Sequence, residues 1–73
     1  MLKKIISNEN ELAKALKERR KDLAITQKDL ARVCDLSHNG ISRIEVADSD
    51  IKLSTLLKMG KFLGFKIVLE MDD

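Results

Sequence analysis

Four hydrogen-bonding side chains fall on one face of a short helical segment: His38, Asn39, Ser42 and Arg43. An asparagine amide and an arginine guanidinium can each form two parallel hydrogen bonds with a planar partner, such as the edge of a nucleobase. Ile41 and Ile44 lie on the opposite face and can anchor the helix in a core. The pattern indicates recognition by hydrogen bonding, with a DNA duplex as the natural partner.

The segment 26–45 fits two short helices joined by a tight turn. Thr26 followed by Asp29 resembles a capping box, which predicts that a helix begins directly after Thr26. Asp35 tolerates the left-handed backbone conformation that ends many helices. Ser37 can then cap the second helix. Two helices joined in this way present the second one to the major groove of DNA.

The residue types do not indicate a metal site, a phosphate-binding loop or a catalytic site. Cys34 and His38 are the single cysteine and the single histidine, so a zinc site would lack its remaining ligands. Cys34 occupies an apolar helical position and is expected to fill the core. No glycine-rich phosphate loop follows a strand, and no serine, histidine and acid are arranged for acyl transfer. We therefore expect no metal, no cofactor and no enzymatic activity.

Composition predicts one small domain, residues 1–73, whose limited core favours a dimer. The formal charge of +2, from 14 basic and 12 acidic side chains, does not by itself indicate nucleic-acid binding. Phe62 and Phe65 are the only aromatic residues, so a stacking platform for single strands is not expected. The chain has neither a membrane-spanning apolar run nor a secretory signal, and we expect a cytoplasmic protein.

Two further helices should flank the central motif. The first runs to about Asp22, and the last is marked by leucines from Leu53 to Leu63 and ended by Gly64. Residues 3–7 could form a short strand. The residues able to cap the first helix are Ser7, Asn8 and Asn10. Its predicted inner face consists of Leu12, Ala15, Leu16 and Leu23.

A basic cluster, Arg19, Arg20 and Lys21, ends the first predicted helix. Cations near a helix C-terminus interact favourably with the helix dipole. The same side chains could instead contact DNA phosphates. The sequence leaves both interpretations open.

The C-terminal tail has the two-residue period of a half-buried strand, predicted at residues 65–71. The apolar positions are Phe65, Ile67, Leu69 and Met71. A lone strand needs a partner, which could be the segment 3–7 or the same strand of a second subunit. We favour the second subunit, because antiparallel pairing across a twofold axis is self-complementary.

The combined pattern of the chain, over about residues 8–64, resembles the Xre/Cro-type helix-turn-helix family. The matching positions are Thr26-Gln27, Leu30-Ala31, Leu36-Ser37, Ile41-Ser42, Ile44-Glu45, Leu53, Thr55-Leu56-Leu57-Lys58 and Leu63-Gly64. The resemblance implies a mostly α, lambda-repressor-like domain of four or more helices, here with one C-terminal strand. It also implies a phosphate contact by Gln27, recognition-helix contacts to DNA by Ser37, His38, Asn39, Ser42 and Arg43, and a structural role for Glu45.

The leading Lys-Ile-Ile segment and the tail further resemble the HipB branch, whose members are antitoxins and autorepressors of toxin–antitoxin operons. The resemblance implies a homodimeric repressor of a pseudo-palindromic operator, with paired C-terminal strands and a HipA-like or HipT-like kinase toxin as a second partner. A stand-alone phage or chromosomal regulator is the alternative within the family.

Five positions depart from the family pattern. Asp35 replaces the usual turn glycine, and Gly40 weakens the recognition helix by about 1 kcal/mol relative to alanine. Ala47, Asp48 and Asp50 stand where relatives often have glycine and phosphate-binding basic residues. The acidic residues Asp35, Asp48 and Asp50 predict modest DNA affinity. They also motivate a rival interpretation, a protein-interaction module that has lost DNA binding.

Overall fold

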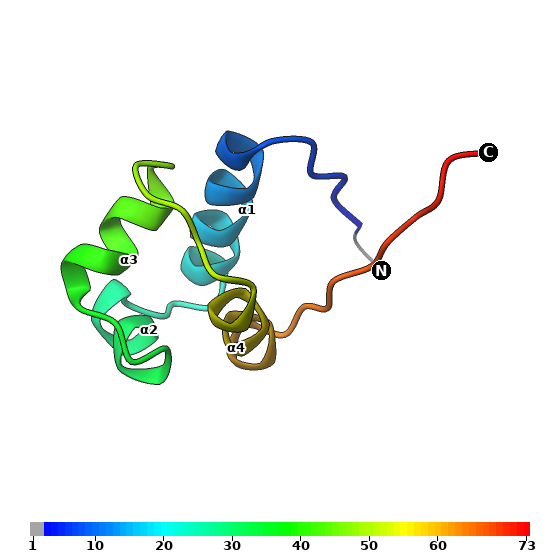
Figure 1. Cartoon of the computed structure of the whole chain (residues 1–73). Coiled ribbons are helices and arrows are strands. Elements are labelled where there is room, and N and C mark those ends of the chain that lie inside the picture. The colour runs from blue at the N-terminus through cyan, green and yellow to red at the C-terminus, as the bar shows by residue number, and fades with distance from the viewer. Residues whose placement is uncertain (1–2) are drawn as a thin grey trace.

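The computed structural model describes residues 3–73, which form four helices in the order α1 (Glu9–Asp22), α2 (Gln27–Val33), α3 (His38–Glu45) and α4 (Leu53–Leu63). The α3 helix packs against α1 and α2, and α4 packs against α2 (Figure 1). The mostly α, helix-turn-helix architecture is confirmed. The two short helices of the motif are α2 and α3.

Side-chain caps fix the starts of three helices. Asn8 is the residue that caps α1, and its Oδ1 accepts a hydrogen bond from the Glu11 amide at 2.9 Å. Thr26 Oγ1 accepts from the Asp29 amide at 3.0 Å to begin α2. Ser37 Oγ accepts from the Gly40 amide at 2.9 Å to begin α3. Each cap satisfies a donor that the first helical turn leaves unpaired.

Left-handed residues end two of the segments as predicted. Asp35, which follows the C-cap residue Cys34 of α2, has φ 55°, and Gly64 has φ 75° after α4. Ala47 also adopts φ 58° after α3, a conformation that costs an alanine about 1 kcal/mol or more. The turn after α2 and the loop after α3 therefore each contain a non-glycine residue in the left-handed conformation.

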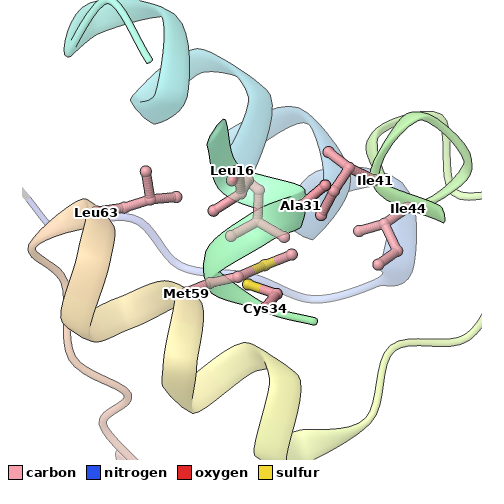
Figure 2. Packing of buried hydrophobic residues seen from close by; sticks show 8 residues of the cluster. Leu16, Ala31, Cys34, Ile41, Ile44, Met59 and Leu63 are labelled. Atoms are coloured by element: carbon pink, nitrogen blue, oxygen red, sulfur yellow. The ribbon is translucent and has the colours of Figure 1, made fainter. Parts of the chain in front are cut away.

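All four helices contribute to one hydrophobic core (Figure 2). Leu30, Ile41, Met59 and Leu63 are almost completely buried, and Cys34 lies among them, as expected. Burial raises the pKa of the Cys34 thiol; the nearby Lys58 opposes this shift and Asp35 adds to it.

The predicted inner face of α1 was partly wrong. Leu16 is buried and Leu12 packs against the core, but Leu23 is 40% exposed and Ala15 is only half-buried. Ala13 and Arg20 are buried instead. The α1 helix ends before Leu23, so the side chain of Leu23 no longer follows the helical period.

The predicted strands do not form in residues 3–73. The tail 65–71 is extended and makes no β-ladder, because a strand requires a second backbone at hydrogen-bonding distance. The segment 3–7 does not pair with it. That segment is tied to α1 by an ion pair between Lys4 and Glu18 at 2.7 Å and by a hydrogen bond from the Ser7 amide to Glu11. Both terminal segments leave the domain on the side away from α2 and α3 (Figure 1).

The four apolar tail residues differ in environment. Phe65 packs against the core of its own chain, so only part of its side chain is available for contact with a second subunit. Ile67, Leu69 and Met71 are 44%, 80% and 75% exposed. The alternating pattern beyond Phe65 is therefore unpartnered in a single chain.

Candidate DNA-binding surface

Packing of α3 decides which of its side chains remain available. Ile41 and Ile44 are buried in the core, which turns the opposite face of this short helix to solvent. His38, Asn39 and Arg43 are exposed on that face, and Ser42 is half-buried. The structure thus brings together the recognition-helix residues predicted from the sequence, and Gln27 joins them from the first turn of α2.

A buried ion pair between Arg20 and Glu45 holds α3 against α1. Arg20 Nε donates to Glu45 Oε2 at 2.6 Å, and Arg20 Nη2 donates to Glu45 Oε1 at 3.0 Å. The two side chains are only 9% and 1% exposed. Arg20 Nη1 also donates to the Ile25 carbonyl at 2.8 Å, so each of the three guanidinium nitrogens makes a hydrogen bond. Glu45 is structural, as the family resemblance implied.

The ionised form of Glu45 is favoured despite its burial. Burial by itself raises the pKa of this carboxyl group. The hydrogen bonds from Arg20 and Gln27, together with the charges of Arg20 and Lys17, outweigh that effect and leave the pKa below its ordinary value. Glu45 is therefore a carboxylate that accepts hydrogen bonds and donates none.

Arg19, Arg20 and Lys21 lie in the last turn of α1, and two of them have a further role that neither interpretation of the basic cluster included. Both make tertiary contacts: Arg20 binds Glu45, and Arg19 Nε donates to the Leu63 carbonyl at the end of α4 at 2.7 Å. Lys21 remains exposed. The signal that could have identified Arg20 was its position one helical turn after Leu16, on the buried face of α1.

Sequence reasoning also missed how the first residues of α2 and α3 are connected. Gln27 Nε2 donates to Glu45 Oε1 at 3.0 Å, and Gln27 Oε1 lies 2.8 Å from His38 Nε2. Gln27 thus connects the buried ion pair to the exposed His38 by hydrogen bonds. This network sets the orientation of the exposed His38 ring.

Two acidic departures from the family pattern pair with basic residues. Arg43 Nη2 donates to the Asp48 carbonyl at 3.1 Å, and Arg43 Nε lies 3.5 Å from Asp48 Oδ2. Asp35 Oδ2 lies 3.8 Å from Lys58 Nζ of α4. Both pairs are largely exposed, so each contributes little to stability. Asp48 nevertheless restrains the guanidinium of Arg43.

The fold and the exposed face of α3 define a helix-turn-helix DNA-binding domain. A helix-turn-helix family model matches residues 16–69, and the chain belongs to this non-enzymatic DNA-binding family. No curated protein sequence matches the chain. None of the helices formed by residues 3–73 is long and apolar enough to cross a membrane.

Among solved structures, the chain is similar to HipB chains. A chain of a HipA–HipB–O2–O3 complex aligns with a TM-score of 0.80 and 26% identity, covering 96% of this chain and 99% of that one. A HipB variant bound to an O2 20-mer aligns over 100% of both chains, with a TM-score of 0.79 and 27% identity. HipB in complex with an O4 20-mer aligns with a TM-score of 0.80 and 26% identity over 96% of this chain and 99% of that one.

Proposed function

We propose that this protein is a sequence-specific repressor that binds operator DNA through α3. The observation that supports this most directly is the exposed set of hydrogen-bonding side chains on α3, while the buried face of the helix is anchored by Ile41, Ile44 and the Arg20–Glu45 pair. A rigid support lowers the entropy lost when side chains are fixed on a base. The similarity to HipB chains in complex with O2 and O4 20-mers supports the same conclusion.

Two residues are proposed to bind the DNA backbone. Gln27 lies at the start of α2, where free helix amides also favour a phosphate. Ser37 uses its oxygen to accept from Gly40, so its hydroxyl hydrogen remains available for a phosphate oxygen. The residues proposed to contact base edges are His38, Asn39, Ser42 and Arg43.

Replacing Arg43 or Asn39 with alanine is expected to weaken operator binding about tenfold, because a paired contact to a base is worth roughly 1 to 3 kcal/mol. A mobility-shift titration with the promoter region of the protein's own gene measures this. Lys14→Ala is the matched control, since Lys14 is exposed on α1 beside the N-terminal segment and should leave binding unchanged. A shift that survives both α3 substitutions unaltered contradicts the proposal. Absence of any shift at low salt favours the interaction-module alternative.

Asp48→Asn is expected to reduce discrimination by Arg43 between guanine and the other bases by a few fold. The substitution weakens a restraint comparable to an exposed ion pair, worth about 0.2 to 1 kcal/mol. Binding to a set of operator variants measures the ratio of affinities rather than affinity alone. Asp50→Asn removes the same charge from the same loop and serves as the control, so it should raise overall affinity without changing that ratio. If Asp48→Asn and Asp50→Asn show the same ratio of affinities for the operator variants, Asp48 does not position Arg43.

We propose that the protein is a homodimer in which the tails pair as antiparallel strands. The alternating residues Ile67, Leu69 and Met71 expose apolar surface that a second tail would cover. Pairing across a twofold axis would also satisfy the backbone groups of residues 65–71 and place two α3 helices on successive major grooves, roughly 34 Å apart.

Deletion of residues 66–73 is expected to convert the dimer to a monomer. The deletion keeps Phe65, which packs against the core, and should therefore preserve the fold. Light scattering measures the mass, and removal of residues 72–73 alone is the control. A truncated protein that retains the dimer mass would place the main interface elsewhere.

We further propose that the protein is the antitoxin of a toxin–antitoxin operon and that a HipA-like or HipT-like kinase is its second partner. The similarity to a chain in a HipA–HipB complex supports this assignment. The neighbouring genes provide the test. A kinase-like reading frame beside this gene, whose product binds the purified protein, is the expected result. Absence of such a reading frame favours a stand-alone regulator.

A further inference from the structure

A chain of hydrogen bonds leads from the core to the ring of His38. Arg20 binds both oxygens of Glu45, whose side chain is 1% exposed. Glu45 Oε1 is 3.0 Å from Gln27 Nε2, and Gln27 Oε1 is 2.8 Å from His38 Nε2. Each bond in this chain restricts the next one, because each group has a limited set of donors and acceptors.

The carboxylate of Glu45 determines how the amide of Gln27 is oriented. Arg20 is permanently charged and keeps Glu45 ionised, so Glu45 can only accept hydrogen bonds. The side chain of Gln27 must therefore direct its amino group toward Glu45. Its carbonyl oxygen then faces His38 and can only accept.

The carbonyl oxygen of Gln27 in turn determines the tautomer of His38. A hydrogen bond between Oε1 and Nε2 requires that Nε2 bears the hydrogen. A neutral imidazole has one N–H, which leaves an unprotonated lone pair on Nδ1. No group in residues 3–73 forms a hydrogen bond with Nδ1, and His38 is exposed at the first position of α3.

We propose that His38, in its neutral form, presents Nδ1 to DNA as a hydrogen-bond acceptor and selects cytosine or adenine at the base it faces. In the major groove, cytosine N4 and adenine N6 offer donors, whereas guanine O6 and N7 and thymine O4 offer acceptors. A fixed acceptor is attracted to the amino groups and repelled by the carbonyl oxygens. This assignment rests on the proposed function, since it requires α3 to enter the major groove.

The tautomer can be tested without DNA. His38 is the only histidine, so the imidazole nitrogen resonances of the ¹⁵N-labelled protein belong to it alone. In alkaline buffer we expect a protonated Nε2 and an unprotonated Nδ1. Gln27→Met removes the fixed acceptor and should introduce a measurable fraction of the other tautomer. A wild-type spectrum with hydrogen on Nδ1, or with the same mixture as Gln27→Met, overturns the inference.

Base selection is tested by enrichment of randomised duplexes with the wild-type protein and with His38→Ala. The position whose preference disappears in His38→Ala is the one that His38 faces, and we expect cytosine or adenine there. Replacing that base with an analogue lacking the amino group should weaken binding by the wild type about three- to tenfold. Guanine or thymine at that position, or an analogue that binds equally well, overturns the inference.

The two experiments separate failure of this inference from failure of the proposed function. If the wild type and His38→Ala enrich the same sequence with identical base preferences, base selection by His38 is overturned and the repressor function still stands. No enriched sequence with the wild-type protein overturns the proposed function and base selection together, even where the spectrum shows hydrogen on Nε2.

Discussion

Replacing Arg20 with methionine is expected to lower the free energy of unfolding by about 3 to 5 kcal/mol at neutral pH, the usual cost of breaking a buried ion pair. Methionine retains apolar volume but leaves the carboxylate of Glu45 buried with Gln27 as its remaining side-chain partner. A chain of this length has a total stability of about 4 to 11 kcal/mol, so the loss is large. Urea unfolding followed by circular dichroism measures it.

The effect of Arg20→Met should depend on pH in a defined direction. In the wild type the pKa of Glu45 is lowered from 4.5, so its contribution to stability is complete above that value and is lost as the pH falls through the folded-state pKa. Without Arg20, burial should raise the pKa of Glu45 above its unfolded value. The penalty in the variant is then greatest at neutral pH and shrinks on acidification. The stability gap between the two proteins should therefore narrow from pH 7 to pH 4.

A double variant provides the control for this pair. Arg20→Met combined with Glu45→Met removes both charges and should recover much of the lost stability, because an apolar pair of similar volume is often as stable as a buried ion pair. A single variant that unfolds within 1 kcal/mol of the wild type, and shows no change of the gap with pH, would contradict the buried arrangement.

The helix-turn-helix was predictable because its signals are local. Thr26 and Ser37 cap the helix that directly follows each of them, and the spacing of Ile41 and Ile44 assigns the two faces of α3. Such patterns depend on residues within one or two helical turns. The positions of four predicted recognition residues on the outer side of α3 follow from the same spacing.

The Arg20–Glu45–Gln27 network was not predictable because its members meet across the fold. Arg20 and Glu45 are 25 positions apart, and charged residues are rarely fully buried unless they are paired. Local patterns therefore assigned Arg20 to the basic cluster at the end of the first helix. The tail illustrates the opposite limit: the alternation after Phe65 predicted a strand, and residues 65–71 form none in a single chain.

Replacing Gly60 with valine is expected to destabilise the protein by about 3 kcal/mol, and alanine by about 1 kcal/mol. Alanine at a helical glycine usually stabilises by about 1 kcal/mol. Here a Cβ would lie 2.7 Å from the Phe65 carbonyl oxygen and 3.2 Å from the Phe65 ring. The Phe65 and Gly64 amides both donate to the Gly60 carbonyl, at 2.9 and 2.8 Å, so this backbone cannot easily move. Overpacking, at about 1 to 3 kcal/mol, therefore outweighs the gain in helix propensity.

Gly40→Ala is the matched control for the Gly60 variants. A Cβ at Gly40 would meet the Ser37 hydroxyl oxygen at 3.3 Å and Leu36 Cβ at 3.6 Å, and neither atom belongs to the backbone. The hydroxyl can shift slightly, so this variant should gain part of the 1 kcal/mol that alanine offers in a helix. Thermal unfolding compares the variants. Equal stabilisation at both positions would mean that Phe65 does not fold back onto α4. The tail would then leave the domain in another direction, and strand pairing across a dimer would need a different geometry.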